Sequence, residues 1–411
     1  MVNVRFSVIA SLASSSLLGA VLAHPGEDHS AEEIKREAAR HSEAHTKAHR
    51  SLGQCTNSPQ ALALKARSIA RRAATAHALR AARGLPDGPV TSRRKRDEES
   101  LANWSEVSHD RTDEEYSLDT PMGTLFGSNA TCALVPESIL GPYWVSGERV
   151  RSNITDGEPG VPMYLDLQFV DTATCEPIPD LLVDLWHSNA TGVYSGVGQP
   201  GQGGLETTFG RGVQVTDSDG VATFSSIFPG HYYMRTPHVH IMSTQGATRL
   251  RNGTYTQGEG ATTHIGQLYF DQDLIDAVER TRPYNTNRYE LTPNAEDVLI
   301  ASAASNAADP YLDYVRLGED LADGLLLWTT VGVDRTADYS EQAQPAAHYA
   351  GGGDDEIDTE DNEGAGESPS SSNAGPQEQP TETPSSSNAG PQEQPTETPP
   401  SSGGNRLRIL F

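Results

Sequence analysis

The sequence predicts an all-β fold, a β-sandwich with short inserted helices, over residues 128–345. Two observations predict it. Short segments in this region alternate apolar and polar residues or are rich in β-branched and aromatic residues, and Gly, Asp and Asn turns separate them. The strand candidates are residues 163–170, 181–186, 221–224, 238–242, 267–270 and 325–333. A region of about 200 residues is also long enough to bury one sizeable core.

One inserted helix is expected at residues 271–280, with Asp271 as its N-cap. Before the sandwich, residues 32–84 are rich in Ala, Arg, Glu and His and poor in β-branched residues, which predicts helix. We therefore expect a helical arm over 24–96 and a linker over 97–127. The basic run RRKR at 93–96 is a candidate processing site, so the arm is either retained or a pro-segment.

Both ends of the chain have distinctive compositions. Residues 1–23 combine Arg5, an apolar stretch and a small residue before His24, which predicts a secretory signal and a secreted, extracellular protein. No stretch reaches the roughly 18 apolar residues of a membrane span. Residues 346–411 are acidic and rich in Pro and Ser, and they contain PSSSNAGPQEQPTET twice, so we expect a disordered tail.

The formal net charge of −26 excludes a nucleic-acid-binding protein, which would need a basic surface. N-glycosylation sequons occur at Asn103, Asn129, Asn153, Asn189 and Asn252. In an exported protein some of them should carry glycan. Asn189 is the doubtful acceptor, because it lies inside a motif described below.

Three cysteines are present: Cys55, Cys132 and Cys175. The odd count allows at most one disulfide within the chain. A Cys55–Cys132 bridge would tie the arm to the sandwich, but the sequence leaves the pairing open. His41, His45 and His49 recur at helical spacing, and such a stripe is more often a solvated face than a metal site.

Metal-binding chemistry is concentrated in residues 228–242, FPGHYYMRTPHVHIM. His238 and His240 are two residues apart, so on a strand both imidazoles point to one face. A Pro-Gly turn before them would bring Tyr232 or Tyr233 toward the histidines, and the spacing does not choose between the two. Imidazole together with phenolate oxygen suits a hard, oxidised metal such as Fe(III) better than zinc.

A second tyrosine, Tyr194, follows the strand candidate that ends at Trp186. The segments 186–195 (WHSNATGVYS), 229–232 (PGHY) and 235–240 (RTPHVH) together resemble the intradiol ring-cleavage dioxygenases, most closely their secreted fungal members. A Gly-Pro-Tyr segment at 141–143 and a glutamine-bearing strand at 266–270 extend the resemblance, which covers about 132–334. Val239 for Ile and Ser188 for Cys are minor departures.

The resemblance implies a β-sandwich that binds one Fe(III) per chain through Tyr194, Tyr232, His238 and His240. It selects Tyr232 rather than Tyr233 as the ligand. The implied reaction is cleavage of a catechol by O2 between the two hydroxylated carbons, giving a cis,cis-muconate-type diacid. Tyr232 would leave the iron and accept one substrate proton.

The resemblance also gives Arg235 the role of stabilising negative charge on the substrate ring, and Gln267 that of a polar contact. Trp186 and His187 are expected to be structural. The loops 141–151 and 196–211 are expected to select among catechols, and the identity of the catechol and a homodimeric assembly stay open.

Three other classes of protein share part of this pattern. A cupin would carry glutamate where this chain has Ser243 or Thr244, and a copper site on His24 leaves the tyrosines unexplained. The remaining alternative is a non-catalytic secreted β-sandwich that binds aromatic or polysaccharide ligands.

Overall fold

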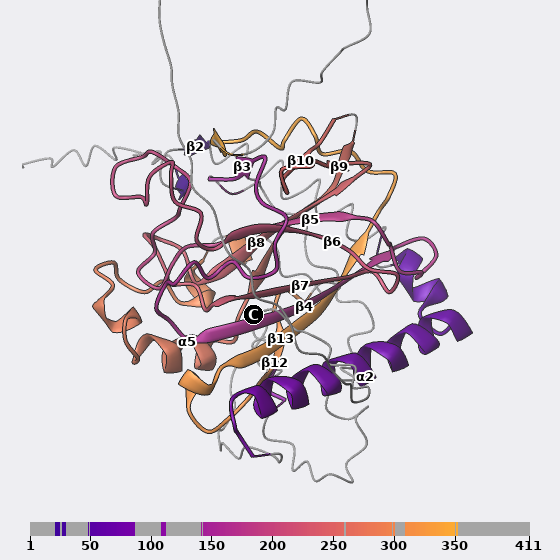
Figure 1. The fold of residues 1–411 in the computed structure, drawn as a ribbon, viewed down its shortest axis with the longest axis horizontal. Coiled ribbons are helices and arrows are strands. Elements are labelled where there is room, and N and C mark those ends of the chain that lie inside the picture. Colours follow the sequence, from indigo (N-terminus) through magenta and orange to yellow (C-terminus); the bar gives the residue numbers. More distant parts are fainter. Residues whose placement is uncertain are drawn as a thin grey trace, which may run out of the picture. The chain divides into compact units, whose positions relative to one another are not determined.

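The computed structural model describes residues 21–24, 27–29, 48, 50–86, 108–111, 141, 143–258, 260–297, 299–300, 309–349 and 351. Two four-stranded sheets form the centre of this part of the chain (Figure 1). The first sheet contains, in spatial order, β11 (Ala261–Tyr269), β8 (His238–Gln245), β5 (Leu182–Trp186) and β6 (Arg211–Val215). The second contains β12 (Asp313–Arg316), β13 (Leu325–Val333), β4 (Pro162–Asp171) and β7 (Val221–Ile227). The predicted β-sandwich is confirmed.

We call these the β8 sheet and the β4 sheet. All neighbouring strands are antiparallel except β13 and β4, which are parallel. The smaller strands are β1 (Val21–His24), β2 (Glu27–His29), β3 (Val145–Ser146), β9 (Thr248–Arg249), β10 (Tyr255–Thr256) and β14 (Ala347–His348). The helices whose two ends both lie among the described residues are α2 (Pro59–Ala82), α5 (Gln272–Glu279) and the 3₁₀ turns η1 (Tyr284–Thr286), η2 (Asn294–Glu296) and η3 (Leu321–Asp323).

The main core lies between the two sheets. Alternate residues of each strand face it, among them Val183 and Leu185 from β5, Val239 from β8, and Leu165 and Leu167 from β4. Because side chains alternate across a strand, the residues between them point to the outer faces. The outer faces of both sheets are also covered by other segments of the chain.

The outer face of the β4 sheet corrects one expectation. The alternation in residues 163–170 predicts a half-buried strand, yet β4 is buried on both faces. Its polar residues Asp166 and Gln168 lie beneath α2. Asp166 binds the guanidinium of Arg71 at 2.7 Å, and Gln168 accepts a hydrogen bond from Ser68 at 2.9 Å. The prediction that one face of this strand is polar is therefore correct, but that face contacts helix α2 rather than water.

Helix α2 is the longest described element of the predicted arm, and it runs along the β4 sheet beside β12 and β13 (Figure 1). Ser58 caps it by accepting a hydrogen bond from the Ala61 amide. The buried Ala76 packs with Leu326 and Trp328 of β13. The arm thus belongs to the same packed unit as the sandwich.

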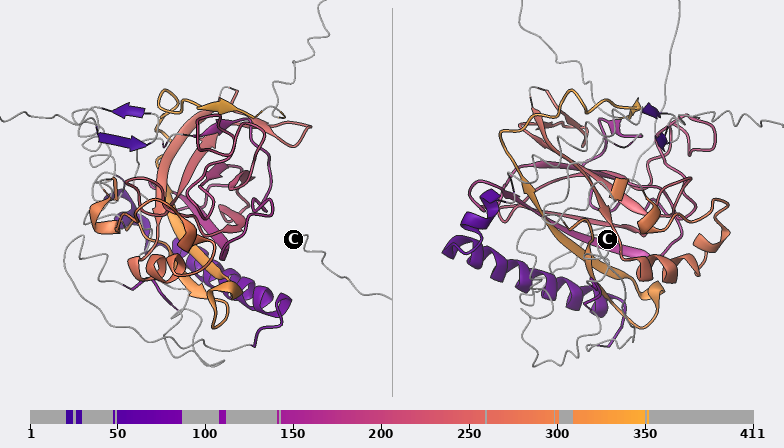
Figure 2. Two further views of the ribbon diagram at one scale, coloured as in Figure 1. Left: turned by 90° about the vertical axis from the view of Figure 1, so that its left-hand side faces the viewer. Right: turned by 180° about the vertical axis from the view of Figure 1, so that it is seen from behind.

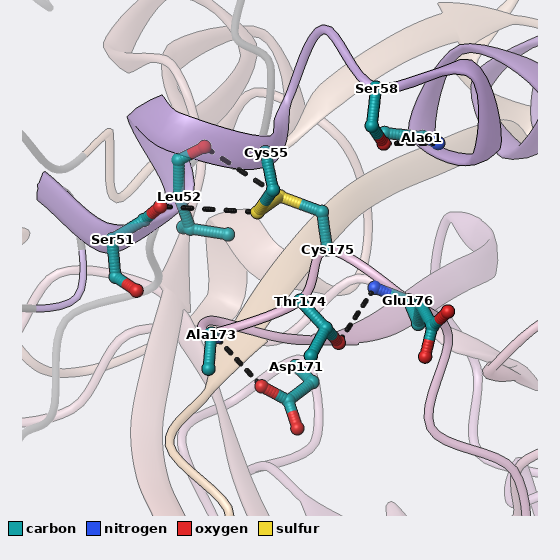
Figure 3. Close-up of a disulfide and its surroundings, with 10 residues drawn as sticks. All are labelled: Ser51, Leu52, Cys55, Ser58, Ala61, Asp171, Ala173, Thr174, Cys175 and Glu176. Carbon is teal, nitrogen blue, oxygen red and sulfur yellow. Dashed lines mark hydrogen bonds between the residues drawn. A yellow bond between two sulfur atoms is a disulfide. The ribbon is translucent and has the colours of Figure 1, made fainter.

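A disulfide joins Cys55, just before α2, to Cys175 in the turn after β4 (Figure 3). The partner of Cys55 is therefore Cys175, not the Cys132 considered above. Cys132 itself, the histidines at 41, 45 and 49, and the sequons at Asn103 and Asn129 lie outside the described residues.

Two predicted boundaries need adjustment. Strand β14 falls within the predicted tail, yet it pairs with β3. Residues 108–111 fall within the predicted linker, yet Asp110 forms a β-bridge with Tyr314. Figure 2 shows the strands of both sheets from two further directions.

Helix α5 starts where expected, but Asp271 makes no side-chain hydrogen bond to the helix. Its carboxylate instead accepts hydrogen bonds from the backbone amide and the ring Nδ1 of His109. Strands β6 and β12 were not among the strands predicted from the sequence. Within the described part of the chain, no helix is long and apolar enough to cross a membrane.

Candidate metal centre

Four side chains meet on the outer face of the β8 sheet. The Tyr194 hydroxyl lies 3.1 Å from His240 Nε2, and the Tyr232 hydroxyl lies 3.1 Å from His238 Nε2. The two Nε2 atoms are themselves 3.1 Å apart. All four residues are at most 3% exposed. The structure thus brings together the four residues that the resemblance proposed as ligands.

The β8 sheet supplies both histidines. His238 and His240 point away from the inter-sheet core, while Val239 between them points into it. The Trp186 ring, on the neighbouring strand, stacks on His240 with the centroids 4.9 Å apart. Gly141 also lies against this ring and leaves no room for a side chain, since a Cβ there would clash with His240 Cε1. The His240 ring is therefore packed against both Trp186 and Gly141.

The two tyrosines come from loops that interlock. Ser188 donates a hydrogen bond to the Gly230 carbonyl at 2.8 Å, and the Gly230 amide donates to the Asn189 carbonyl at 3.0 Å. A Cβ on Gly192 would lie 2.2 Å from the His231 carbonyl oxygen. The glycines of the two motifs thus let the Tyr194 loop and the Tyr232 loop pack backbone to backbone.

Asn189 organises the Tyr194 loop from within. Its Oδ1 accepts hydrogen bonds from the amides of Thr191 and Val193, and its Nδ2 donates to Glu158 at 2.9 Å. Both ends of the Asn189 amide are therefore in use. His187 is fully buried between Ser188 O and Ser226 Oγ, and burial lowers its pKa to about 4, consistent with a structural role.

The chemistry of the donor set fits a metal ion. His238 Nδ1 lies 2.6 Å from the Thr236 carbonyl, which keeps the proton on Nδ1 and leaves a lone pair on Nε2. Burial, reinforced by His238, lowers the pKa of His240 well below its usual value, so this ring is neutral. Burial raises the pKa of Tyr232 to about 12, although Arg235 opposes the rise. Two phenol oxygens and two imidazole nitrogens that converge in this way suit a hard cation such as Fe(III).

Arg235 lies beside these ligands in a fully buried network. Its Nε donates to Asp297 at 2.8 Å, and its Nη1 lies 3.5 Å from the Tyr232 hydroxyl. Burial disfavours the charged guanidinium, but Asp297, Tyr232 and Tyr269 together more than offset this, and the net effect raises the pKa of Arg235. A fixed positive charge therefore stands next to the oxygen of a candidate ligand.

Gln267 is also in the site. The register of β11 and β8 places it opposite His240, and its Oε1 accepts hydrogen bonds from Arg235 Nη2 at 2.5 Å and from the Tyr269 hydroxyl at 2.8 Å. Its buried Nε2 has no hydrogen-bond partner among the described residues. An unpartnered buried donor is costly unless a ligand or water accepts from it.

Sequence reasoning missed Asp297 and Tyr269. Asp297 orients Arg235 and also accepts from the Thr236 amide at 3.0 Å. The alternation of β11 could have indicated Tyr269, because it lies two residues after Gln267 and hence on the same face. Nothing in the local pattern points to Asp297, which is 62 residues from Arg235. Tyr233, the alternative to Tyr232, is exposed and lies outside the cluster.

Residues 140–307 match the family model Dioxygenase_C, described as dioxygenase. The matched range contains all four candidate ligands together with Arg235 and Gln267. No curated protein matches the chain.

Several solved structures are similar to part of the chain. An intradiol ring-cleavage dioxygenase from Tetranychus urticae is 28% identical, over 50% of this chain and 97% of that one, with a TM-score of 0.42. A dioxygenase domain from Streptomyces sp. SirexAA-E is 22% identical over 49% of this chain and 98% of that one, with a TM-score of 0.32. Catechol 1,2-dioxygenase from Pseudomonas arvilla C-1 is 20% identical over 51% of this chain and 65% of that one, with a TM-score of 0.35.

Proposed function

We propose that this chain is a non-haem ferric dioxygenase that cleaves catechol-type rings with O2 between the two hydroxylated carbons. The products would be cis,cis-muconate-type diacids. The observation that carries the proposal is the convergence of Tyr194, Tyr232, His238 and His240, with neighbouring oxygen and nitrogen atoms 3.1 Å apart. The family match over residues 140–307 supports it.

These four side chains would hold one Fe(III), which when bound would supply the Lewis acidity and redox chemistry that couple a catechol to O2. Tyr232, held as a phenolate, would accept one of the two protons that a catechol gives up and become a phenol, and hydroxide in the site would take the other as water. Arg235, whose Nη1 lies 3.5 Å from the Tyr232 hydroxyl, would favour the anionic form of the substrate through its fixed charge.

Gln267 would direct its unpartnered Nε2 at a substrate oxygen. The depth of the site would keep bulk water away from the reacting atoms, since Arg235 and Gln267 are each only 1% exposed. Electrostatic interactions with the substrate are stronger in such surroundings than in water.

We also propose that the enzyme acts outside the cell. The signal-like residues 1–23 support this, and so does the Cys55–Cys175 disulfide, because disulfides persist in oxidising compartments.

An absorption spectrum of the purified protein tests the function. Tyrosinate ligation of Fe(III) should colour the resting protein red-brown, and catechol added under nitrogen should shift the band to longer wavelength. The Tyr232→Phe variant should lose or alter the band, whereas Tyr233→Phe is the matched control and should keep it. A protein that stays colourless after iron reconstitution would contradict the proposal and favour the non-catalytic binding protein.

A further inference from the structure

Large apolar side chains are exposed at six of the described positions: Leu62, Leu205, Val215, Tyr233, Met234 and Tyr289. Leu62 is on α2 and Val215 ends β6. The other four lie on loops that contact the backbone of a candidate tyrosine ligand or of its immediate neighbour. Single exposed apolar residues are normal, but these four all lie on segments tied by hydrogen bonds to the two tyrosine loops, which favours a binding surface there.

Tyr233 and Met234 form the tip of a tight turn. The turn is closed by a hydrogen bond from the Arg235 amide to the Tyr232 carbonyl at 3.1 Å. Tyr232 and Arg235 are buried in the metal centre, whereas Tyr233 is 57% and Met234 46% exposed. The turn therefore connects the site directly to the surface.

Met234 has a φ of +62°, in the left-handed region that favours glycine. Glycine would fit this turn with less strain and without exposing an apolar side chain. The chain instead holds a flexible thioether there, which adapts well to aromatic ligands. Strain of this kind is typical of functional positions.

Tyr289 is attached to the same loop. His231, the residue before Tyr232, lies with its Nε2 3.0 Å from the Tyr289 carbonyl, and Asn287 donates a hydrogen bond to the His231 carbonyl at 2.7 Å. These two bonds fix the segment that carries Tyr289, which is 52% exposed.

Leu205 is attached to the other tyrosine. The Gly203 amide donates to the Tyr194 carbonyl at 2.7 Å, and the Tyr194 amide donates to Gln202 Oε1 at 2.7 Å. Leu205, two residues after Gly203, is 53% exposed. Of the two loops expected from the sequence to select the substrate, this is the one that presents an exposed large apolar side chain among the described residues.

We propose that Leu205, Tyr233, Met234 and Tyr289 form an apolar collar that binds a hydrophobic aryl or alkyl substituent of the substrate. The inference rests on the proposed ring-cleaving function and specifies its substrate class. All four side chains are uncharged, so a carboxylate substituent would gain no ionic partner from them. Tyrosine and methionine both make favourable contacts with aromatic groups. The preferred substrate is thus a catechol with an apolar extension at the ring.

The test is an anaerobic titration of the iron-loaded protein, following the shift of the absorption band. The ligands are catechol, 4-phenylcatechol and 3,4-dihydroxybenzoate. We expect 4-phenylcatechol to bind roughly tenfold more tightly than catechol, and kcat/KM under air to show the same order. Tyr233→Ser, Tyr289→Ser and Met234→Gly should each reduce this ratio.

Met234→Gly is the most informative variant, because it removes the apolar side chain and suits the backbone better. Thermal denaturation should show that this variant is at least as stable as the wild type. A reduced preference for 4-phenylcatechol over catechol would then come from the lost side chain and not from unfolding. Leu62→Ser is the matched control. Leu62 lies on α2 and is as exposed as Tyr289, so this variant should leave the preference for 4-phenylcatechol over catechol unchanged.

The outcomes separate the two proposals. A protein that binds iron and cleaves catechol without favouring 4-phenylcatechol would overturn the collar and leave the proposed function intact. A protein that neither binds iron nor cleaves any catechol would overturn the proposed function first. A stable dimer that Met234→Gly dissociates would also overturn the collar, because the four side chains would then be buried between two copies.

Discussion

The Tyr269 hydroxyl donates a hydrogen bond to Oε1 of Gln267 over 2.8 Å. Arg235 Nη2, a second donor, reaches the same atom. Because two donors face one end of the amide, that end must be the oxygen, and the NH2 group must point the other way. Tyr269 therefore determines where the free donor of Gln267 is directed.

We expect Tyr269→Phe to reduce kcat by about fivefold, since one hydrogen bond of about 1 kcal/mol that orients Gln267 is lost. Iron content and the colour of the resting protein should not change, because Tyr269 is not a candidate ligand. Steady-state oxygen uptake at several substrate concentrations would separate kcat from KM. Tyr164→Phe is a suitable control, because the Tyr164 hydroxyl accepts a hydrogen bond from Arg83 under the arm. A variant that loses iron would show that Tyr269 acts on the ligands instead.

Interlocking of the two tyrosine loops gives a second prediction. Gly192 and Gly157 have almost the same φ, +79° and +80°, but a Cβ on Gly192 would meet the His231 carbonyl at 2.2 Å, whereas nothing lies within 4 Å at Gly157. Alanine at 157 should cost about 1 kcal/mol of backbone strain. Alanine at 192 should cost about 1–3 kcal/mol more through overpacking, and it should weaken iron binding by displacing Tyr194 or Tyr232.

Urea denaturation of the two variants, with iron content measured in parallel, would test this comparison. If Gly192→Ala and Gly157→Ala lowered the free energy of unfolding equally, the positive φ alone would explain the loss of stability, and the contact with His231 would not contribute. Loss of iron in Gly157→Ala would show that the site responds to strain anywhere in this region.

The parts of the site that follow from local periodicity could be predicted from the sequence. The spacing of His238 and His240 suffices to place both rings on one face, whatever the rest of the fold. Tyr194, which is 46 residues before His240, could be joined to them only through the resemblance to a family pattern. The residue that supports Arg235 could not be predicted, because the contact with Asp297 depends on how a distant loop packs.

Burial was harder to predict than strand position. Asp166 and Asp184 look like outward-facing, solvated residues, yet Arg71 and Arg72 cover the first, while Trp144 and Tyr255 donate hydrogen bonds to the second. The sequence pattern distinguishes the two faces of a strand but does not show whether water or another segment lies on the polar face.

His109 gives a prediction about pH. The ring is 2% exposed and lies between two carboxylates, with Nδ1 2.6 Å from Asp271 and Nε2 2.9 Å from Asp309. Burial alone would lower its pKa, but Asp271 and Asp309 outweigh burial and raise the pKa to about 10. Because the folded pKa exceeds the unfolded value of about 6.5, the stabilisation is complete below that pH and is lost as pH rises toward 10.

We therefore expect the free energy of unfolding to fall between about pH 6.5 and 10, by a few kcal/mol from this residue. In His109→Gln that dependence should be largely absent, and the variant should be less stable than the wild type at pH 6. Urea denaturation at pH 6 and pH 9 would measure both effects. If the free energy of unfolding changed by the same amount with pH in the wild type and in His109→Gln, the charged state of His109 would be contradicted.

The arm gives a prediction about processing. If a protease cleaves at the basic run 93–96, the arm should stay attached, because Cys55–Cys175 links it to the sandwich and Arg72 binds Asp166 beneath α2. Cleaved protein should migrate as one species on a non-reducing denaturing gel and as two on a reducing gel. The Cys55→Ser and Cys175→Ser double variant should be about 2–5 kcal/mol less stable. Release of the arm without reduction would contradict the disulfide.

Three sequons in the described part of the chain differ in how their asparagines are used. Asn153 and Asn252 are exposed, and the Oδ1 of each accepts a hydrogen bond from the amide two residues later. Asn189, by contrast, donates through Nδ2 to Glu158, the same nitrogen that would carry a glycan. Thr191, which completes that sequon, donates its hydroxyl to Asn189 Oδ1 and so has a structural reason to be there.

When the protein is produced through a secretory pathway, we expect glycan on Asn153 and Asn252 and none on Asn189. Mass spectrometry of peptides after enzymatic deglycosylation, which converts a glycosylated asparagine to aspartate, would report each position. Asn252→Gln should then lower the apparent mass without changing iron content. Asn189→Asp should weaken iron binding, because it places a carboxylate against Glu158, and adding Glu158→Gln should restore it. Glycan on Asn189 in an iron-loaded protein would contradict the role of this residue in holding the Tyr194 loop.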